Sequence, residues 1–378
     1  MEEEPAILSS IACNLDAAIL SAAFPLLEEG RVEAIEWAFD TLFWAEQVPD
    51  WFTELLRAYS QQNRLVGHGV YFSLLSGRWS PEQQQQWLAR LQQVSREFSF
   101  DHITEHFGFF TGQNFHHGAP LPTPYTAATL RIGQDRLGRM SDACRCPVGL
   151  ENLAFAYSLA EVEQQGEFLE KLLEPVNGFL ILDLHNLYCQ LHNFGVPYEA
   201  LIALYPLDRV REIHISGGSW EASAAAPGQQ VRRDTHDEAV PAAVFDLLKR
   251  TLPRCPHLKY VVLEQLGNGL QTTASQAQFR RDFQQMETLI KKYRKGLSAR
   301  LHPPFLPLRA FVPGPLVEDA VLHAQQQQLS QILETAASFA EAQQRLLASA
   351  LARTDWAVES WEPHMLETAL SIAQKWNK

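Results

Sequence analysis

The chain has 378 residues, of which 46% are hydrophobic and 20% are charged, and its formal net charge is −13. This composition is typical of a folded globular protein with room for one large domain and a smaller one. The acidic balance argues against sequence-independent binding to nucleic acid, because such binding depends on cationic contacts to phosphate.

Cysteine usage and the N-terminus indicate a cytoplasmic protein. The five cysteines are odd in number and form no evident disulfide framework, so we expect reduced thiols. The first ten residues, MEEEPAILSS, are acidic and lack the charged and apolar regions of a signal peptide. No run reaches the roughly 18 apolar residues that a membrane span needs. We therefore expect no membrane partner.

Eight strand-like runs alternate with helix-like segments. The expected strands are 9–16, 32–40, 64–74, 100–110, 146–155, 178–188, 210–218 and 260–268. Between them, Ser80 and Pro81 have the pattern of an N-cap followed by proline at the first helical position. Residues 271–295 form another expected helix, which ends in Lys and Arg where the helix dipole favours cations.

This alternation predicts an α/β fold, a TIM (β/α)8 barrel over residues 1–295 that carries the catalytic site. A doubly wound open sheet is the alternative, but no glycine-rich phosphate loop follows the first strand. Residues 296–316 are rich in proline and predict an extended linker. Residues 317–378 predict a C-terminal helical extension, with helices within 317–353 and 355–376.

Ionisable side chains recur where the expected strands end, and in a TIM barrel these ends form the active-site face. They are His68, Glu105, His106, Glu151 with Asn152, Asp183 with His185 and Asn186, His214, Asp234 with His236, and Glu264. Alone, each has an ordinary structural explanation, such as a hydrogen-bonded histidine or a helix N-cap. As a set they favour metal ligation, because buried ionisable groups are costly unless their charge is compensated.

The ligand chemistry limits the choice of metal. Imidazoles and carboxylates without thiolates suit iron, manganese or zinc. The number of candidate ligands exceeds what one ion takes, so we expect two or three ions, with carboxylates such as Glu151 bridging them. The residues alone do not choose between iron and zinc.

Four further residues are harder to assign. Glu36 faces the same rim but has no polar neighbour in sequence, so its role stays open. His185 shares a face with Asp183 if strand alternation continues, which favours the site. We interpret His102 as structural and Cys189 as a small core residue.

Taken in order, several motifs resemble the multinuclear non-heme iron-dependent oxidative enzymes (MNIO), the family that includes the methanobactin-biosynthesis oxidase. The motifs are GHGVYFSL, ITEHFGFF, LPTPYT, GLENLAF, LILDLHNLY, VREIHISG, DTHD and VLEQ, and the similarity covers about residues 9–268. The resemblance implies a TIM barrel with two or three irons, including a mixed-valent Fe(II)/Fe(III) pair, and O2 as co-substrate. It also implies a ribosomally made precursor peptide, modified most often at cysteine, and in many cases a separate protein that binds the leader of that peptide.

The family pattern can be carried over residue by residue. It places metal ligands at His68, His106, Glu151, Asp183, His214, Asp234, His236 and Glu264, and His185 stands where relatives often have an asparagine that ligates the third metal. We expect Glu105 to orient His106, as carboxylates do for metal-bound imidazoles, and we count Glu105, His185 and Asn186 as catalytic candidates.

The sequence departs from the family in three places. Relatives commonly have Ser-Asp-His where this chain has Thr104-Glu105-His106, the segment between LPTPYT and GLEN is short, and residues 296–378 lie outside the match. The extension is expected either to hold the peptide or its partner near the barrel mouth, or simply to pack on the barrel.

The alternative function is a di- or trimetal hydrolase or isomerase, similar to endonuclease IV or xylose isomerase.

Overall fold

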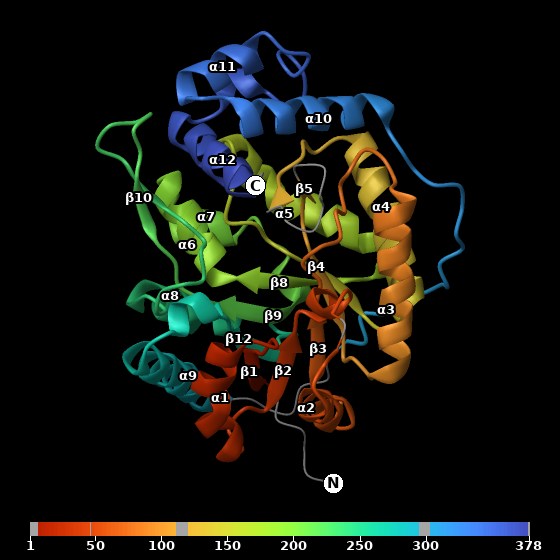
Figure 1. Ribbon diagram of the computed structural model, residues 1–378, viewed down its shortest axis with the longest axis vertical. Helices are drawn as coiled ribbons and strands as arrows, with labels where there is room; N and C mark the ends of the chain where they lie inside the picture. Colours follow the sequence, from red (N-terminus) through yellow and green to blue (C-terminus); the bar gives the residue numbers. More distant parts are fainter. Residues whose placement is uncertain (1–6, 46, 111–119, 295–302, 377–378) are drawn as a thin grey trace.

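The computed structural model describes residues 7–45, 47–110, 120–294 and 303–376. Eight parallel strands close into a barrel in the order β1-β12-β9-β8-β7-β4-β3-β2, with helices outside it (Figure 1). The strands are β1 (Leu8–Ala12), β2 (Ala34–Trp37), β3 (Leu65–His68), β4 (Ile103–His106), β7 (Val148–Glu151), β8 (Phe179–Asp183), β9 (Val210–Ile215) and β12 (Tyr260–Leu263). The predicted TIM barrel is confirmed.

Helices follow the strands and cover the barrel. They are α1 (Ala17–Glu28), α2 (Asp50–Ser60), α3 (Gln86–Glu97), α4 (Ala127–Cys144), α5 (Leu159–Leu173), α6 (Leu184–Asn193), α7 (Tyr198–Ile202), α8 (Ala242–Thr251) and α9 (Thr273–Arg294). Asp16, Thr126 and Ser158 cap α1, α4 and α5 by accepting backbone N–H groups that have no partner within the helix. Among the described residues, every helix is too short or too polar to cross a bilayer.

Two small hairpins rise from the loops that follow strands. β5 (Phe109–Phe110) pairs with β6 (Pro120–Leu121), and β10 (Trp220–Ala222) pairs with β11 (Gln230–Arg232). One-turn helices lie at Phe39–Leu42, Pro81–Gln85, Glu174–Val176, Leu207–Arg209, Leu252–Arg254, Gly267–Leu270 and Val358–Ser360. These elements leave the barrel strands shorter than their sequence patterns predicted.

The strand expected over 178–188 shows why the prediction ran too long. β8 ends at Asp183, and α6 begins at Leu184. The Asp183 side chain accepts the Asn186 backbone N–H at 2.6 Å, so it acts as the N-cap of α6. His185 and Asn186 therefore lie in the first turn of a helix, and the expectation that strand alternation continues to His185 is wrong.

The segment that follows α9 contacts the barrel at the amino-terminal ends of its strands. Residues 296–302 of the predicted linker lie outside the described residues. Phe305 is only 4% exposed and packs against Phe179, the first residue of β8, with ring centroids 5.8 Å apart. Its ring also lies 5.8 Å from the Arg211 guanidinium, at the start of β9. Phe305 thus closes the floor of the barrel, opposite the end where the ionisable residues gather.

The chain then runs along the outside of α4 to the helical extension (Figure 1). The Gly314 carbonyl accepts a hydrogen bond from Arg139 of α4 at 2.9 Å. The extension consists of α10 (Ala320–Thr335), α11 (Phe339–Leu347) and α12 (Pro363–Trp376), as the sequence predicted. It shares an apolar cluster with Phe109, Phe155 and Val231, which all follow the carboxyl ends of strands. The extension therefore packs on loops near the barrel mouth.

We predict that Phe305→Ala destabilises the protein by about 3–5 kcal/mol, because it removes a buried aromatic ring and leaves a cavity at the barrel floor. Urea unfolding measures this change. Leu308→Ala is the matched control, since Leu308 lies three positions further on and is 97% exposed. A loss for Phe305→Ala no larger than that of the control contradicts a closing role for this ring.

Candidate metal centre

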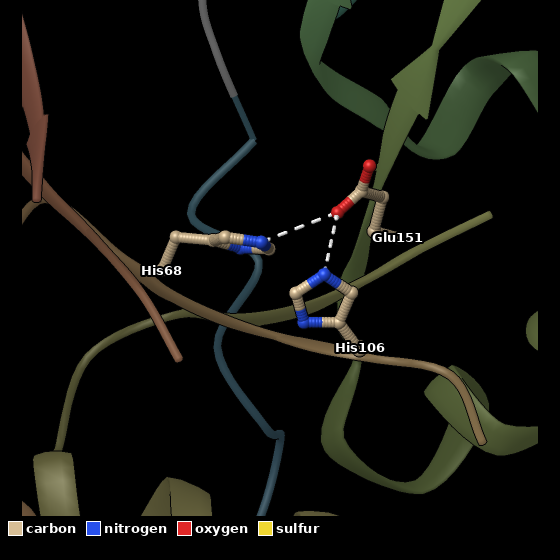
Figure 2. Close-up of side chains that lie close together, drawn as sticks. All are labelled: His68, His106 and Glu151. Carbon is tan, nitrogen blue, oxygen red and sulfur yellow. Dashed lines mark ion pairs between the residues drawn. The ribbon is translucent and has the colours of Figure 1, made fainter. Parts of the chain in front are cut away.

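Three side chains at the ends of neighbouring strands converge at the barrel mouth (Figure 2). His68 ends β3, His106 ends β4 and Glu151 ends β7. The strand register places His106 directly beside Glu151. The Glu151 Oε2 atom lies 3.2 Å from His68 Nε2 and 3.7 Å from His106 Nε2. These atoms form one group that fits a metal ion.

The opposite nitrogen of each imidazole is held by the barrel. His68 Nδ1 lies 2.8 Å from Thr104 Oγ1, and that hydroxyl donates to the Gly67 carbonyl, so Nδ1 carries the proton. His106 Nδ1 donates to the Gly69 carbonyl at 3.1 Å. In both histidines Nε2 is therefore the nitrogen that can lose its proton and bind a metal beside Glu151. Fixing the tautomer in this way is how proteins orient metal-binding imidazoles.

A second group consists of Glu151, Asp183 and His214. β8 and β9 are neighbours, and their register pairs Asp183 with His214. Asp183 uses Oδ1 to cap α6, while its Oδ2 is buried without a hydrogen-bond partner. His214 Nδ1 is likewise buried without one, 3.9 Å from Glu151 Oε1. These two unpaired atoms face the same space.

A third group joins Asp183 to His236 and Glu264. Glu264 follows β12, and its Oε1 lies 3.2 Å from His236 Nδ1. His236 has a left-handed backbone with φ 52°, which is uncommon for a residue other than glycine. Within each of the three groups, the ligand atoms lie within 4.8 Å of one another. Glu151 and Asp183 each belong to two groups, as bridging carboxylates would.

Two buried amides fix the bridging carboxylates. Asn186 Nδ2 lies 3.2 Å from Glu151 Oε1 and donates to the Asn152 carbonyl at 2.8 Å. Asn152 in turn exchanges hydrogen bonds with the backbone N–H and carbonyl of Asp183. The structure thus brings Asn186, a predicted catalytic residue, into contact with the candidate ligands, where it holds Glu151.

His185 and Asp234 lie beside the third group. Asp234 Oδ1 is 2.8 Å from His236 Nε2 and 2.8 Å from His185 Nδ1. His185 Nε2 accepts a hydrogen bond from Arg232 Nε at 3.1 Å. Both ring nitrogens of His185 are therefore engaged by protein groups. The role of His185 as a metal ligand stays a prediction. Ligation through Nε2 would require the hydrogen bond from Arg232 to break.

Glu105 is completely buried beneath His106. Its Oε1 accepts the His106 backbone N–H at 2.9 Å and lies 3.5 Å from His106 Nδ1. The Gly69 carbonyl is closer to that nitrogen, so it shares the orienting role that the sequence assigned to Glu105 alone.

Burial and charge oppose each other at the centre. Burial alone would lower the pKa of His68, but its hydrogen bond to Glu151 and the charges of Glu36 and Glu151 raise that pKa to about 10. Burial likewise opposes the charge on His214, yet neighbouring carboxylates raise its pKa well above the ordinary value. Burial, followed by the charges of Glu151 and Asp234, raises the pKa of Asp183. In the metal-free chain, protons therefore occupy sites that bound cations would take, and metal binding would release them.

The residues present fit a multinuclear metal centre. The unpaired atoms Asp183 Oδ2 and His214 Nδ1 face into it, and all the ligand atoms are imidazole nitrogen or carboxylate oxygen.

A further group contains Glu36, Glu212 and His214, deeper in the barrel. Sequence reasoning left Glu36 open and missed Glu212. The sequence did contain a signal for Glu212. It lies two residues before His214 on β9, and residues two apart on a strand point to the same face.

A family model described as "RiPP precursor modification enzyme MbnB/TglH/ChrH" matches residues 35–280. A UPF0276 protein of Rhizorhabdus wittichii is 27% identical over 208 residues, covering 53% of this chain and 69% of that protein. A UPF0276 protein of Bordetella pertussis is 32% identical over 166 residues, covering 44% of this chain and 57% of that protein. A UPF0276 protein of Caulobacter vibrioides is 28% identical over 170 residues, covering 44% of this chain and 58% of that protein.

Among solved structures, a xylose isomerase domain protein from Planctomyces limnophilus is similar at 16% identity and a TM-score of 0.49, covering 76% of this chain and 98% of that one. A xylose isomerase domain protein from Alicyclobacillus acidocaldarius gives 16% identity and a TM-score of 0.45, covering 76% of this chain and 99% of that one.

A buried carboxylate next to the centre gives the metal-free protein a characteristic pH dependence. Asp40 Oδ2 accepts hydrogen bonds from Val70 N, Tyr71 N and Trp87 Nε1 at 2.9–3.0 Å. Burial, together with the charge of Glu105, raises the pKa of Asp40 from 3.8 to about 7. The folded chain therefore binds more protons than the unfolded chain between these values, so this group lowers stability as pH rises from about 4 to 7.

We predict that Asp40→Asn removes this part of the pH dependence, since an amide oxygen still accepts hydrogen bonds but carries no charge. Above pH 7 the variant should be more stable than the wild-type chain, by up to about 4 kcal/mol. Urea unfolding of metal-free protein at pH 5 and pH 8 measures the difference. Asp246→Asn, at an exposed position on α8, is the control. Equal pH slopes for wild type and Asp40→Asn contradict the prediction.

Proposed function

Because the chain belongs to the family of RiPP precursor modification enzymes MbnB/TglH/ChrH, we propose that it is a multinuclear iron, O2-dependent oxidase that modifies a ribosomally synthesised precursor peptide at cysteine. The observation that carries the proposal is the sharing of Glu151 and Asp183 among three ligand groups at the barrel mouth. Shared carboxylates hold several ions close together, as a multinuclear centre requires.

Three ligand sets, which share Glu151 and Asp183, would hold the proposed ions. His68, His106 and Glu151 hold the first, Glu151, Asp183 and His214 hold the second, and Asp183, His236 and Glu264 hold the third. Asp234 acts on the third through its 2.8 Å contact with His236, and His185 takes part through Asp234 or by direct ligation. When bound, iron supplies the one-electron chemistry with O2 that amino-acid side chains lack.

The chain's own residues set the conditions for that chemistry. Thr104 and the Gly69 carbonyl hold protons on the Nδ1 atoms of His68 and His106, so that their Nε2 atoms stay free to bind metal. Asn186 restrains Glu151. The apolar cluster shared by the mouth loops and the extension limits the access of water to this side of the barrel.

The proposed substrate is a peptide with a cysteine thiol, which a metal binds as the thiolate. The five cysteines of the chain are all free thiols in the structure, which supports a reducing cytoplasmic setting. We further propose that a leader-binding partner protein presents the peptide, either on the extension or beside it. The donor set alone also suits zinc or manganese, so a hydrolase or isomerase is the alternative that metal analysis tests.

We predict that Glu151→Gln leaves at most one ion bound per chain, because Glu151 belongs to two of the three groups. Elemental analysis of protein purified without O2 measures the ratio, and Mössbauer spectroscopy identifies the iron. Glu221→Gln is the control, since Glu221 is an exposed carboxylate on β10. Unchanged metal content in Glu151→Gln contradicts the ligand assignment, and zinc or manganese in place of iron favours the alternative function.

We also predict that modification of the peptide requires O2. A cysteine-containing peptide encoded beside the gene is incubated with iron-loaded protein, with and without O2, and its mass is measured. The same peptide with serine in place of cysteine is the matched control and should remain unmodified. Full conversion without O2 rejects the oxidative scheme, and conversion of the serine peptide rejects cysteine as the target.

A further inference from the structure

His214 is held from beneath by two carboxylates that the ligand groups at the mouth do not use. Glu36, on β2, places Oε2 3.0 Å from His214 Nε2. Glu212, on β9, places Oε1 3.7 Å from the same nitrogen. All three side chains are at most 3% exposed. The three residues come from strands on two sides of the barrel and meet in its interior.

The geometry assigns the proton on His214. An ionised carboxylate only accepts hydrogen bonds, so Nε2–H donates to Glu36. Nδ1 is then the nitrogen left for a metal, and it is this atom that is buried without a hydrogen-bond partner and lies 3.4 Å from Glu264 Oε2. Glu36 thereby selects the tautomer whose free nitrogen faces the candidate metal centre.

Glu212 is itself fixed by a network that reaches the barrel floor. Its Oε2 accepts from His102 Nε2 at 2.7 Å, and His102 Nδ1 lies 3.0 Å from Asp101. Asp101 is paired with Arg211, at 2.7 Å, and with Lys259. His102 and Glu212 are completely buried, so neither has water as an alternative partner. This network keeps the Glu212 carboxylate beside His214.

We propose that Glu36, assisted by Glu212, is a positioning residue that orients His214 and increases the affinity of the centre for the ion that His214 binds. This inference rests on the proposed metal centre but concerns residues that lie outside the three ligand groups at the mouth. A carboxylate behind a metal-bound imidazole fixes the ring and increases its basicity, and loss of such a partner typically lowers metal affinity about 10–100-fold.

A further cation between Glu36, Glu212 and His214 is the competing explanation, since their atoms also lie close enough to surround one. The 3.0 Å separation of His214 Nε2 and Glu36 Oε2 is that of a hydrogen bond. An ion there would displace the Nε2 proton and make the ring bridge two metals. The hydrogen-bonded arrangement requires neither change, and the orphaned Nδ1 already supplies the ligand atom.

The test compares Glu36→Gln and Glu36→Leu with the wild-type chain by Co(II) titration, using the visible absorption of the bound ion as the readout. Glutamine keeps an oxygen acceptor but loses the charge, whereas leucine loses both. We expect affinity for one ion to fall about 10–100-fold in the order wild type, Gln, Leu, with a changed absorption band. Glu212→Gln should produce a smaller fall, because Glu212 lies farther from Nε2.

Glu287→Gln is the matched control, since it removes a buried carboxylate that is paired with Arg31 on the outside of the barrel. Thermal unfolding of the metal-free variants separates folding from binding. Unchanged Co(II) affinity in folded Glu36→Gln and Glu212→Gln overturns the inference, even if their stability falls. Loss of one whole ion, beyond those of the three mouth groups, favours the competing cation and also overturns it. A wild-type chain that binds no metal overturns the proposed function itself.

Discussion

The constraint on which the structure depends is the burial of several carboxylates inside one barrel. Glu36, Glu151, Asp183 and Glu212 are at most 3% exposed, and each belongs to a group of candidate ligands that includes a histidine. Buried like charges are costly unless cations compensate them. In the chain alone, histidines that retain their protons supply the compensation. These groups, which hold protons when no cation is bound, are therefore suited to exchange protons for metal ions.

The barrel topology explains why so much of this centre was predictable from the sequence. Parallel strands point their carboxyl ends toward one face, so polar residues at the ends of expected strands must meet there. This argument alone placed His68, His106, Glu151, Asp183 and His214 together, although they are spread over more than a third of the chain. Strand register then determined which residues became neighbours, with His106 beside Glu151 and Asp183 beside His214.

The remaining features depended on contacts that no local pattern encodes. Strand alternation failed for His185 because the cap at Asp183 starts a helix one residue earlier. The open role of Glu36 depended on His214, which lies 178 residues away in the sequence. The proline-rich segment predicted an extended tether, but one aromatic residue within it, Phe305, found a buried place at the barrel floor. Each case is decided by side chains meeting across the tertiary fold.

The two ends of the barrel serve different purposes, and the C-terminal residues contact both. At the floor, Phe305 packs against Arg211, which pairs with Asp101 beneath His102. At the mouth, Glu367 of α12 accepts hydrogen bonds from Ser223 and Ala224, in the hairpin whose second strand supplies Arg232 to His185. Most candidate metal ligands thus lie at the ends of barrel strands, with His236 in the loop after β11, while other residues around them come from loops and the extension. Changes to the extension would leave the charge balance of the barrel interior intact, whereas changes to the interior would disturb it.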